Sequence, residues 1–265
     1  MRTIPAASST RKTSDKSPVT RRYATRPAAD PFKAEKQATS QRLAPRKAEL
    51  ARGLLIYLNR ERYAPSLERR PRAHGGARLR AGRTSDGLTL TKACQLIAAT
   101  EMARSIGRPL NRHITVHWEA AGVADSGAAK ATTAFLKYLR EWLGGRTAYV
   151  WARENGDGKG SHLHILAHIP TGRRMNGVRS RRWIERITGR PYRPGTICTR
   201  RIAGSGDPAG PVYAVNFGAA LAYVLKGAAP DVAAALGIDH EPGGRIIGKR
   251  CGTSRNIDAK ARRAI

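Results

Sequence analysis

The fold of this chain is decided by residues 147–169, TAYVWARENGDGKGSHLHILAHI. Residues 147–154 and 161–169 are rich in aromatic, β-branched and aliphatic side chains, which predicts two strands. The segment between them, NGDGKG, favours a tight turn because Asn, Asp and Gly tolerate the backbone angles that such turns need. We therefore expect the two strands to pair as an antiparallel hairpin.

Helices and strands alternate on both sides of this hairpin. Helices are predicted over about 88–106, 127–143, 176–188 and 216–226, and further strands over 113–118 and 196–202. The last segment, 245–257, combines a short strand with a Gly-rich turn. This order predicts an α+β fold in which flanking helices pack on an antiparallel β-sheet.

The first 85 residues differ from the rest in composition. Residues 1–80 hold 20 Lys and Arg against six Asp and Glu, and the first 46 residues have almost no large apolar side chain. Such a segment cannot bury enough surface to offset its chain entropy. We expect 1–85 to be a disordered basic region with one short amphipathic helix, and 86–265 to form the folded domain.

Composition narrows the class of function. The 265 residues carry 49 Lys and Arg against 19 Asp and Glu, a net charge of +30 that favours a polyanionic partner. The densest apolar run, residues 54–58, is far shorter than the roughly 20 residues of a membrane span, so we expect no membrane partner. Cys94, Cys198 and Cys251 form no C-x-x-C pair, which fits a reducing cytoplasm.

Three residues of the hairpin predict a metal site. His162 and His164 flank Leu163 on one strand, so both imidazoles point to the same face of the sheet. Glu154 lies at the end of the facing strand, where the tight loop can bring its carboxylate near both rings. Two imidazoles and one carboxylate suit a divalent ion. His168 is a weaker candidate for a further ligand.

A rival metal site involves the preceding strand. His113 and His117 share one face of that strand, and Glu119 follows. We rank this site lower, because no third ligand is predicted to pair with the strand. The alternative interpretation is that these histidines face a neighbouring strand or DNA.

Tyr223 and Lys226 form a second signal. They are three residues apart on a predicted helix, so they share a face. A Tyr on an Ala-rich helix is often only part of the core. A phenol has a pKa near 10, so forming phenolate at pH 7 costs roughly 4 kcal/mol. A neighbouring cation reduces this cost, which favours a nucleophilic role for Tyr223.

Taken together, these motifs make the chain resemble the HUH endonucleases, in particular the single-tyrosine rolling-circle replication initiators of plasmids and small single-stranded-DNA viruses. The similarity covers about residues 108–227: HITVHW resembles the first motif, ENGDGKGSHLHIL the second and AYVLKG the third, which is Y-x-x-K. The resemblance implies that Glu154, His162 and His164 bind Mg²⁺ or Mn²⁺, that Tyr223 is the nucleophile, and that Lys226 assists it electrostatically.

The same resemblance implies the reaction and its partners. The tyrosine would nick single-stranded DNA at a replication origin and keep the 5′-phosphate covalently. The chain has no Walker motif, so a host helicase and a host polymerase would supply the remaining steps. The two-tyrosine initiators are not matched, because positions 219 and 227 are Ala219 and Gly227.

Other functions remain open from the sequence. A relaxase or transposase of the same superfamily would use His168 as third ligand and a tyrosine upstream of the histidines (Tyr23, Tyr57 or Tyr63). A metal-dependent hydrolase would not need Tyr223, and a non-enzymatic nucleic-acid-binding protein would need only the charge. Trp118 and Trp151 have two interpretations, stacking on bases or packing in the core.

Overall fold

A computed structural model describes residues 82–264, except 145–146, 159 and 176. Most of the basic region predicted for 1–85, with its amphipathic helix, therefore lies outside the described residues. Thr84 and Ser85, at the end of that region, form β1 (Thr84–Ser85), which pairs antiparallel with β6 (Ile246–Ile247).

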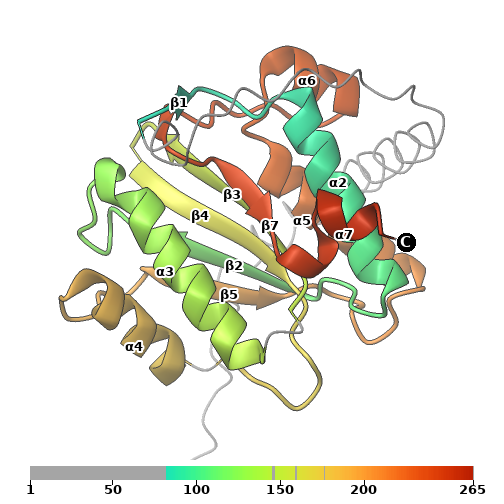
Figure 1. Ribbon diagram of the computed structural model, residues 1–265, viewed down its shortest axis with the longest axis horizontal. Coiled ribbons are helices and arrows are strands. Elements are labelled where there is room, and N and C mark those ends of the chain that lie inside the picture. The colour runs from blue at the N-terminus through green and yellow to red at the C-terminus, as the bar shows by residue number, and fades with distance from the viewer. Residues whose placement is uncertain (1–81, 145–146, 159, 176, 265) are drawn as a thin grey trace, which may run out of the picture. The chain divides into compact units, whose positions relative to one another are not determined.

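Five antiparallel strands form the main sheet, in the order β5-β2-β4-β3-β7 (Figure 1). Their bounds are β2 (Arg112–His117), β3 (Tyr149–Gly156), β4 (Gly160–Ala167), β5 (Ile197–Arg201) and β7 (Cys251–Thr253). The predicted hairpin is β3–β4, with Glu154 directly opposite His162. The α+β class and the antiparallel sheet are confirmed.

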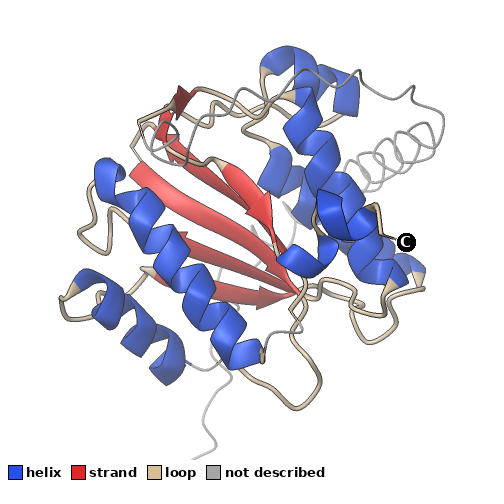
Figure 2. Ribbon diagram, viewed as in Figure 1, coloured by secondary structure: helices blue, strands red, loops and turns tan. Residues whose placement is uncertain are grey.

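The helices cover both faces of this sheet, as Figure 2 shows. They are α2 (Leu90–Ser105), α3 (Asp125–Leu143), α4 (Gly177–Thr188), α5 (Pro211–Leu225), α6 (Pro230–Leu236) and α7 (Ala259–Arg262), with a 3₁₀ turn over Arg255–Ile257. α5 begins five residues before the expected position 216, at Pro211, since Pro is well accommodated in the first helical turn. None of the described helices is long and apolar enough to cross a membrane.

Side chains alternate between the two faces of the sheet, so the core consists of two clusters, one on each face. Leu163 and Ile165 of β4 pack in one buried cluster with Phe135 of α3 and Trp183 of α4. Leu166 points to the opposite face and packs in a second cluster, with residues of α2, α5 and α6. Because side chains alternate, His162 and His164 share the face of Leu166 and lie on the α5 side.

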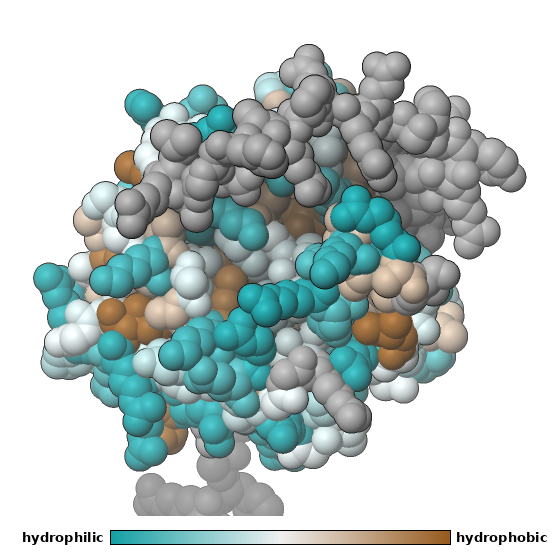
Figure 3. All heavy atoms as spheres, in the orientation of Figure 1, coloured by the Kyte–Doolittle hydropathy of each residue, from teal (hydrophilic) through white to brown (hydrophobic). Residues whose placement is uncertain are grey.

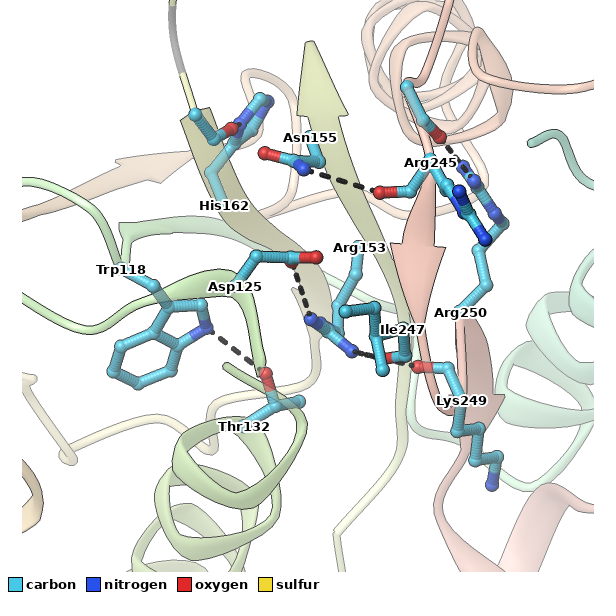
Figure 4. Close-up of polar contacts among 12 residues, drawn as sticks. Trp118, Asp125, Thr132, Arg153, Asn155, His162, Arg245, Ile247, Lys249 and Arg250 are labelled. Atoms are coloured by element: carbon cyan, nitrogen blue, oxygen red, sulfur yellow. Dashed lines mark hydrogen bonds and ion pairs between the residues drawn. The ribbon is translucent and has the colours of Figure 1, made fainter. Parts of the chain in front are cut away.

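Both tryptophans of the strand region belong to the core. Trp118 is completely buried and donates its Nε1–H to Thr132 Oγ1 of α3 at 3.0 Å (Figure 4). Trp151 is 5% exposed. The interpretation that they pack in the core is therefore confirmed, and the stacking interpretation is wrong for both.

A buried arginine fixes β3 from the face opposite the histidines. Arg153 is fully buried; its guanidinium donates to Ile247 O at 2.9 Å and lies 3.4 Å from Asp125 Oδ1 (Figure 4). It thereby links β3 to β6 and to the start of α3. Since Glu154 is the next residue, this anchor also limits where its carboxylate can lie.

A candidate metal centre beside an exposed tyrosine

Strand register brings the three predicted ligands together. Glu154 of β3 pairs with His162 of β4, and His164 pairs with Ala152, so all three side chains emerge on the α5 face. Their ligand atoms lie within 4.8 Å of one another, and all three residues are buried. Glu154, His162 and His164 therefore form a cluster that could hold a metal ion.

Two distances within this cluster suit a shared cation. Glu154 Oε2 lies 3.2 Å from His162 Nε2 and 3.5 Å from His164 Nε2. Two donors each about 2.1 Å from one ion, at about 90–110°, would be about 3.0–3.4 Å apart. The buried atoms Glu154 Oε1 and His164 Nε2 have no hydrogen-bond partner. Since buried polar atoms are rarely left unpaired, these two fit a group that accepts their lone pairs.

The outer ring nitrogens are held in place by the protein. Gly160 O lies 2.9 Å from His162 Nδ1, and Thr115 Oγ1 lies 3.2 Å from His164 Nδ1. Such contacts orient each ring so that Nε2 faces the cluster. Thr115 lies on β2 directly opposite His164. We did not identify Thr115 from the sequence, although it shares its strand face with His113 and His117.

Glu154 is an anionic centre. Burial alone would raise the pKa of its carboxyl, but the contacts from His162 and His164 and the charge of Lys226 outweigh burial and lower that pKa. Burial lowers the pKa of His164, although Glu154 opposes the shift. The site therefore offers a carboxylate together with a neutral His164 ring, which are the protonation states a metal requires.

His168 is not part of this cluster. It follows the end of β4, and its Nδ1 lies 2.8 Å from Pro109 O. Its role as a further ligand, which the relaxase alternative also needs, is therefore not supported by the geometry. Tyr23, Tyr57 and Tyr63 lie outside the described residues.

The two histidines of the rival site border the same cluster. β2 is the neighbour of β4, with His117 opposite His162, and their rings stack at 5.5 Å between centroids. His113 lies against His164 at 5.6 Å. The alternative that these histidines face a neighbouring strand is confirmed. The pKa of His113 falls to about 4, because of burial first and then the nearby His164 and Arg200.

Tyr223 stands at the edge of this group of rings. It lies in the last turn of α5, is 43% exposed, and packs edge-on against His164 at 5.0 Å and His113 at 5.6 Å. Lys226 Nζ lies 4.9 Å from the centroid of its ring. The predicted pair therefore does share a face, and it lies beside the three candidate ligands.

The charge of Lys226 is shared with two carboxylates. Its Nζ lies 3.1 Å from Glu154 Oε2 and also contacts Glu241 Oε2. Burial alone would lower the pKa of Lys226, but Glu241 and Glu154 outweigh burial and raise it. Glu241 lies in the irregular segment after α6, where the sequence carries no motif that would have singled it out.

The phenol of Tyr223 is not activated by its surroundings alone. Burial raises its pKa, Lys226 and Arg200 act to lower it, and Glu154 and Glu241 act to raise it. Lys226 thus acts in the expected direction without reversing the net shift. Glu154 and Glu241, which pair with Lys226, contribute to the net upward shift in the pKa of Tyr223.

A glycine allows α5 to approach the carboxylate closely. A Cβ atom on Gly227 would lie 3.3 Å from Glu154 Oε1 and 3.2 Å from the Cα of Gly243. A side chain here would require the Glu154 carboxylate or the backbone at Gly243 to shift by a few tenths of an ångström. The Gly that follows Lys226 therefore permits the close packing between the end of α5 and Glu154.

Comparison with known proteins found no match: no family model, no curated protein and no solved structure is similar to this chain at a significant level.

Proposed function

We propose that this protein is a metal-dependent DNA strand transferase of the HUH type, which nicks single-stranded DNA at a replication origin and initiates rolling-circle replication. One observation carries the proposal. Tyr223 is exposed and lies directly against His164, within a cluster that combines three candidate ligands and Lys226. A metal site that only activated water would not need an accessible phenol at this position.

The three ligands fit Mg²⁺ or Mn²⁺, and two imidazoles shift the preference slightly toward Mn²⁺. Such an ion, when bound, would polarise the scissile phosphate and offset its developing charge. Lys226 and Arg200, the two cations that act to lower the pKa of the Tyr223 phenol, would attract the same phosphate.

Tyr223 performs the transfer. Its Oη attacks the scissile phosphorus in line, an Oη–P bond forms, and the P–O3′ bond breaks. The phenol proton leaves, and the released O3′ takes up a proton to become a free 3′-hydroxyl. The 5′-phosphate stays on Tyr223 as a phosphotyrosine diester. Because this bond conserves the energy of the phosphodiester, a later 3′-hydroxyl can reseal the strand without ATP. Host helicase and polymerase in the cytoplasm would complete replication.

Capture of the covalent product tests this function and identifies the cleaved sequence in the same experiment. The protein is incubated with Mn²⁺ and a random-sequence single-stranded DNA pool labelled at its 3′ end, and the products are separated on a denaturing gel. We expect a labelled protein–DNA adduct, whose sequenced DNA shares one 5′ end. Tyr223→Phe should bind the DNA and form no adduct.

The rival functions give different products. Cleavage without adduct would indicate a metal-dependent hydrolase, and binding without cleavage would indicate a non-enzymatic DNA-binding protein. Full adduct formation by Tyr223→Phe, with the link mapped to another tyrosine, would reject the assignment of the nucleophile.

A further inference from the structure

A second site lies at the other edge of the sheet. β7 is an edge strand, and a cleft of about 1070 Å³ runs along it between α3 on one side and α2 and α7 on the other. Trp151 and Tyr149 of β3 lie at its floor. Neither Tyr223 nor any of the three candidate metal ligands lines this β7 cleft.

The walls of the β7 cleft are strongly basic. Of its described lining residues, eight are Lys or Arg and one is acidic. Lys130, Lys137 and Arg140 come from α3, and Lys92 and Lys260 come from the opposite wall. Figure 3 shows this face, where hydrophilic side chains spread over α3 and α7. The acidic residue, Asp258, accepts the backbone N–H groups of Lys260 and Ala261 and so caps α7.

Basic residues that line the cleft act on two buried groups of its lining. Burial raises the pKa of Tyr149, and Arg140 from one wall and Arg255 from the other both oppose that shift. Burial likewise raises the pKa of Cys251, against the combined effect of Lys92 and Lys249. Positive charges on both sides of β7 therefore act on buried groups that line the cleft.

The edge of β7 also borders the cleft, and its backbone groups are oriented by the pairing with β3. Arg153 N–H donates to Arg250 O, and Ser254 N–H donates to Tyr149 O, so these residues of β7 and its flanks face β3. Residues of an antiparallel strand alternate in the side to which their N–H and C=O groups point, so both groups of Cys251 and Thr253 point away from β3, toward the open edge. Because this edge presents donors and acceptors alike, the preference of the cleft for phosphate oxygens must come from its lysines and arginines.

The cleft offers no anchor for bases or for a peptide side chain. Its aromatic residues, Tyr149 and Trp151, are each only 5% exposed. Proteins that grip single strands stack bases on accessible aromatic rings, and peptide grooves hold apolar anchors in open pockets. The large exposed hydrophobic residues of the described chain (Leu90, Val178, Val212 and Tyr223) all lie outside the cleft. The β7 cleft must therefore recognise its ligand by the charges along the ligand's backbone.

We infer that the β7 cleft binds the phosphate backbone of double-stranded DNA, separately from the tyrosine site. Its long basic side chains can neutralise successive phosphates without reading any base. The inference goes beyond the proposed nicking reaction and does not depend on it, because it uses neither Tyr223 nor a metal. If the chain does nick DNA, the cleft would hold the duplex beside the single strand that is cut.

Charge-matched variants of the full chain test this inference. Binding of a fluorescent duplex of about 20 base pairs is measured by anisotropy in EDTA across a range of salt concentrations. Variant Lys130→Gln/Lys137→Gln/Arg140→Gln removes three charges from the α3 wall. The control Arg174→Gln/Arg182→Gln/Arg186→Gln removes three exposed charges in and near α4, outside the cleft.

Counterion release sets the expected size of the effect. Each phosphate contact contributes about 0.9 to the slope of log affinity against log salt concentration. One contact therefore strengthens binding about eightfold at about 0.1 M salt relative to 1 M salt. Losing three contacts should weaken duplex binding more than about 100-fold at about 0.1 M salt and reduce the slope by up to about 2.7. The α4 control should change affinity only a few-fold. A variant that combines Lys92→Gln and Lys260→Gln on the opposite wall with Lys249→Gln just before β7 should reproduce the large loss.

Three results would overturn the inference. Equal losses in the cleft variants and the α4 control would mean that binding follows net charge alone. Loss of single-stranded but not duplex binding would assign the cleft to a single strand. Loss of polyglutamate binding with duplex binding intact would assign it to an acidic peptide. Failure of the nicking proposal looks different: the wild-type protein would form no adduct, while its duplex binding and the losses in the cleft variants would be unchanged.

Discussion

Replacing Glu154 by Gln distinguishes the contribution of this carboxylate to the stability of the fold from its proposed role as a metal ligand. The side chains of Glu154 and Lys226 are 4% and 9% exposed, and Nζ lies 3.1 Å from Oε2. In Glu154→Gln the shape and the hydrogen-bonding oxygen remain, and the negative charge is lost. Without metal, we expect the variant to fold and to be less stable at pH 7.

The magnitude follows from two opposing effects. With an effective dielectric constant of about 20, the attraction between Lys226 and Glu154 at 3.1 Å is roughly 5 kcal/mol. Removing the carboxylate also removes its desolvation penalty, which is several kcal/mol, and Lys226 keeps its contact with Glu241. The net loss should be about 2 kcal/mol in the free energy of unfolding.

Urea unfolding in EDTA, followed by circular dichroism, measures this loss. For a urea dependence of about 2 kcal/mol per M, the midpoint should fall by roughly 1 M. Because the folded-state pKa of Glu154 is lowered from its ordinary value of 4.5, its stabilising effect is complete above about pH 5. That effect is lost as the pH falls below 4.5, so the gap between wild type and Glu154→Gln should narrow there.

Glu241→Gln is the matched control, because Glu241 contacts the same Lys226 but is 55% exposed. An exposed ion pair contributes about 0–1 kcal/mol, so this variant should lose less than Glu154→Gln. If Glu154→Gln were as stable as wild type, or if the control lost more, the ion pair with Lys226 would not be what stabilises the buried carboxylate.

Three further predictions concern the site and the basic region. His164→Ala should abolish binding of Mn²⁺ measured by calorimetry, whereas His168→Ala should retain it, because that ring contacts Pro109 rather than the cluster. Lys226→Met should bind Mn²⁺ at least several-fold more tightly, since a competing cation leaves Glu154, and yet form less adduct; weaker metal binding would contradict this. Deleting residues 1–80, which carry a net charge of +14, should leave adduct formation at saturating DNA intact and make non-specific DNA binding less dependent on salt. If the truncated protein folds and binds metal but cannot cleave at any DNA concentration, the nucleophile would lie in the deleted segment.

The sequence was most informative where the contacts are local. Only residues 157–159 join β3 to β4, so the length of this connection fixes which residues face each other, and the Glu154–His162 pairing could be predicted. Tyr223 and Lys226 are likewise related by the geometry of one helix turn. In both cases the chain between the two groups is too short to allow other arrangements.

Long-range pairings could not be predicted in the same way. More than 40 residues, including α3, separate β2 from β4, and no turn motif specifies that they are neighbours. The positions of His113 and His117 beside the cluster were therefore missed. Glu241 comes from an irregular segment, and β7 is only three residues long, so neither produces a periodic pattern. The β7 cleft could not be predicted for the same reason.

The strand order explains why the candidate metal ligands and the basic DNA-binding cleft that we infer lie in different parts of the sheet. β4 is the central strand, and hydrogen-bonded neighbours on both sides hold His162 and His164 in register. A ligand set on such strands can keep the sub-ångström geometry that in-line transfer requires. β7 is an edge strand with free backbone groups, which is a liability unless the edge is covered or charged. Lysines and arginines on both walls discourage pairing with another strand and at the same time attract a polyanion. The charges that protect this edge are therefore the charges that we expect to bind duplex DNA.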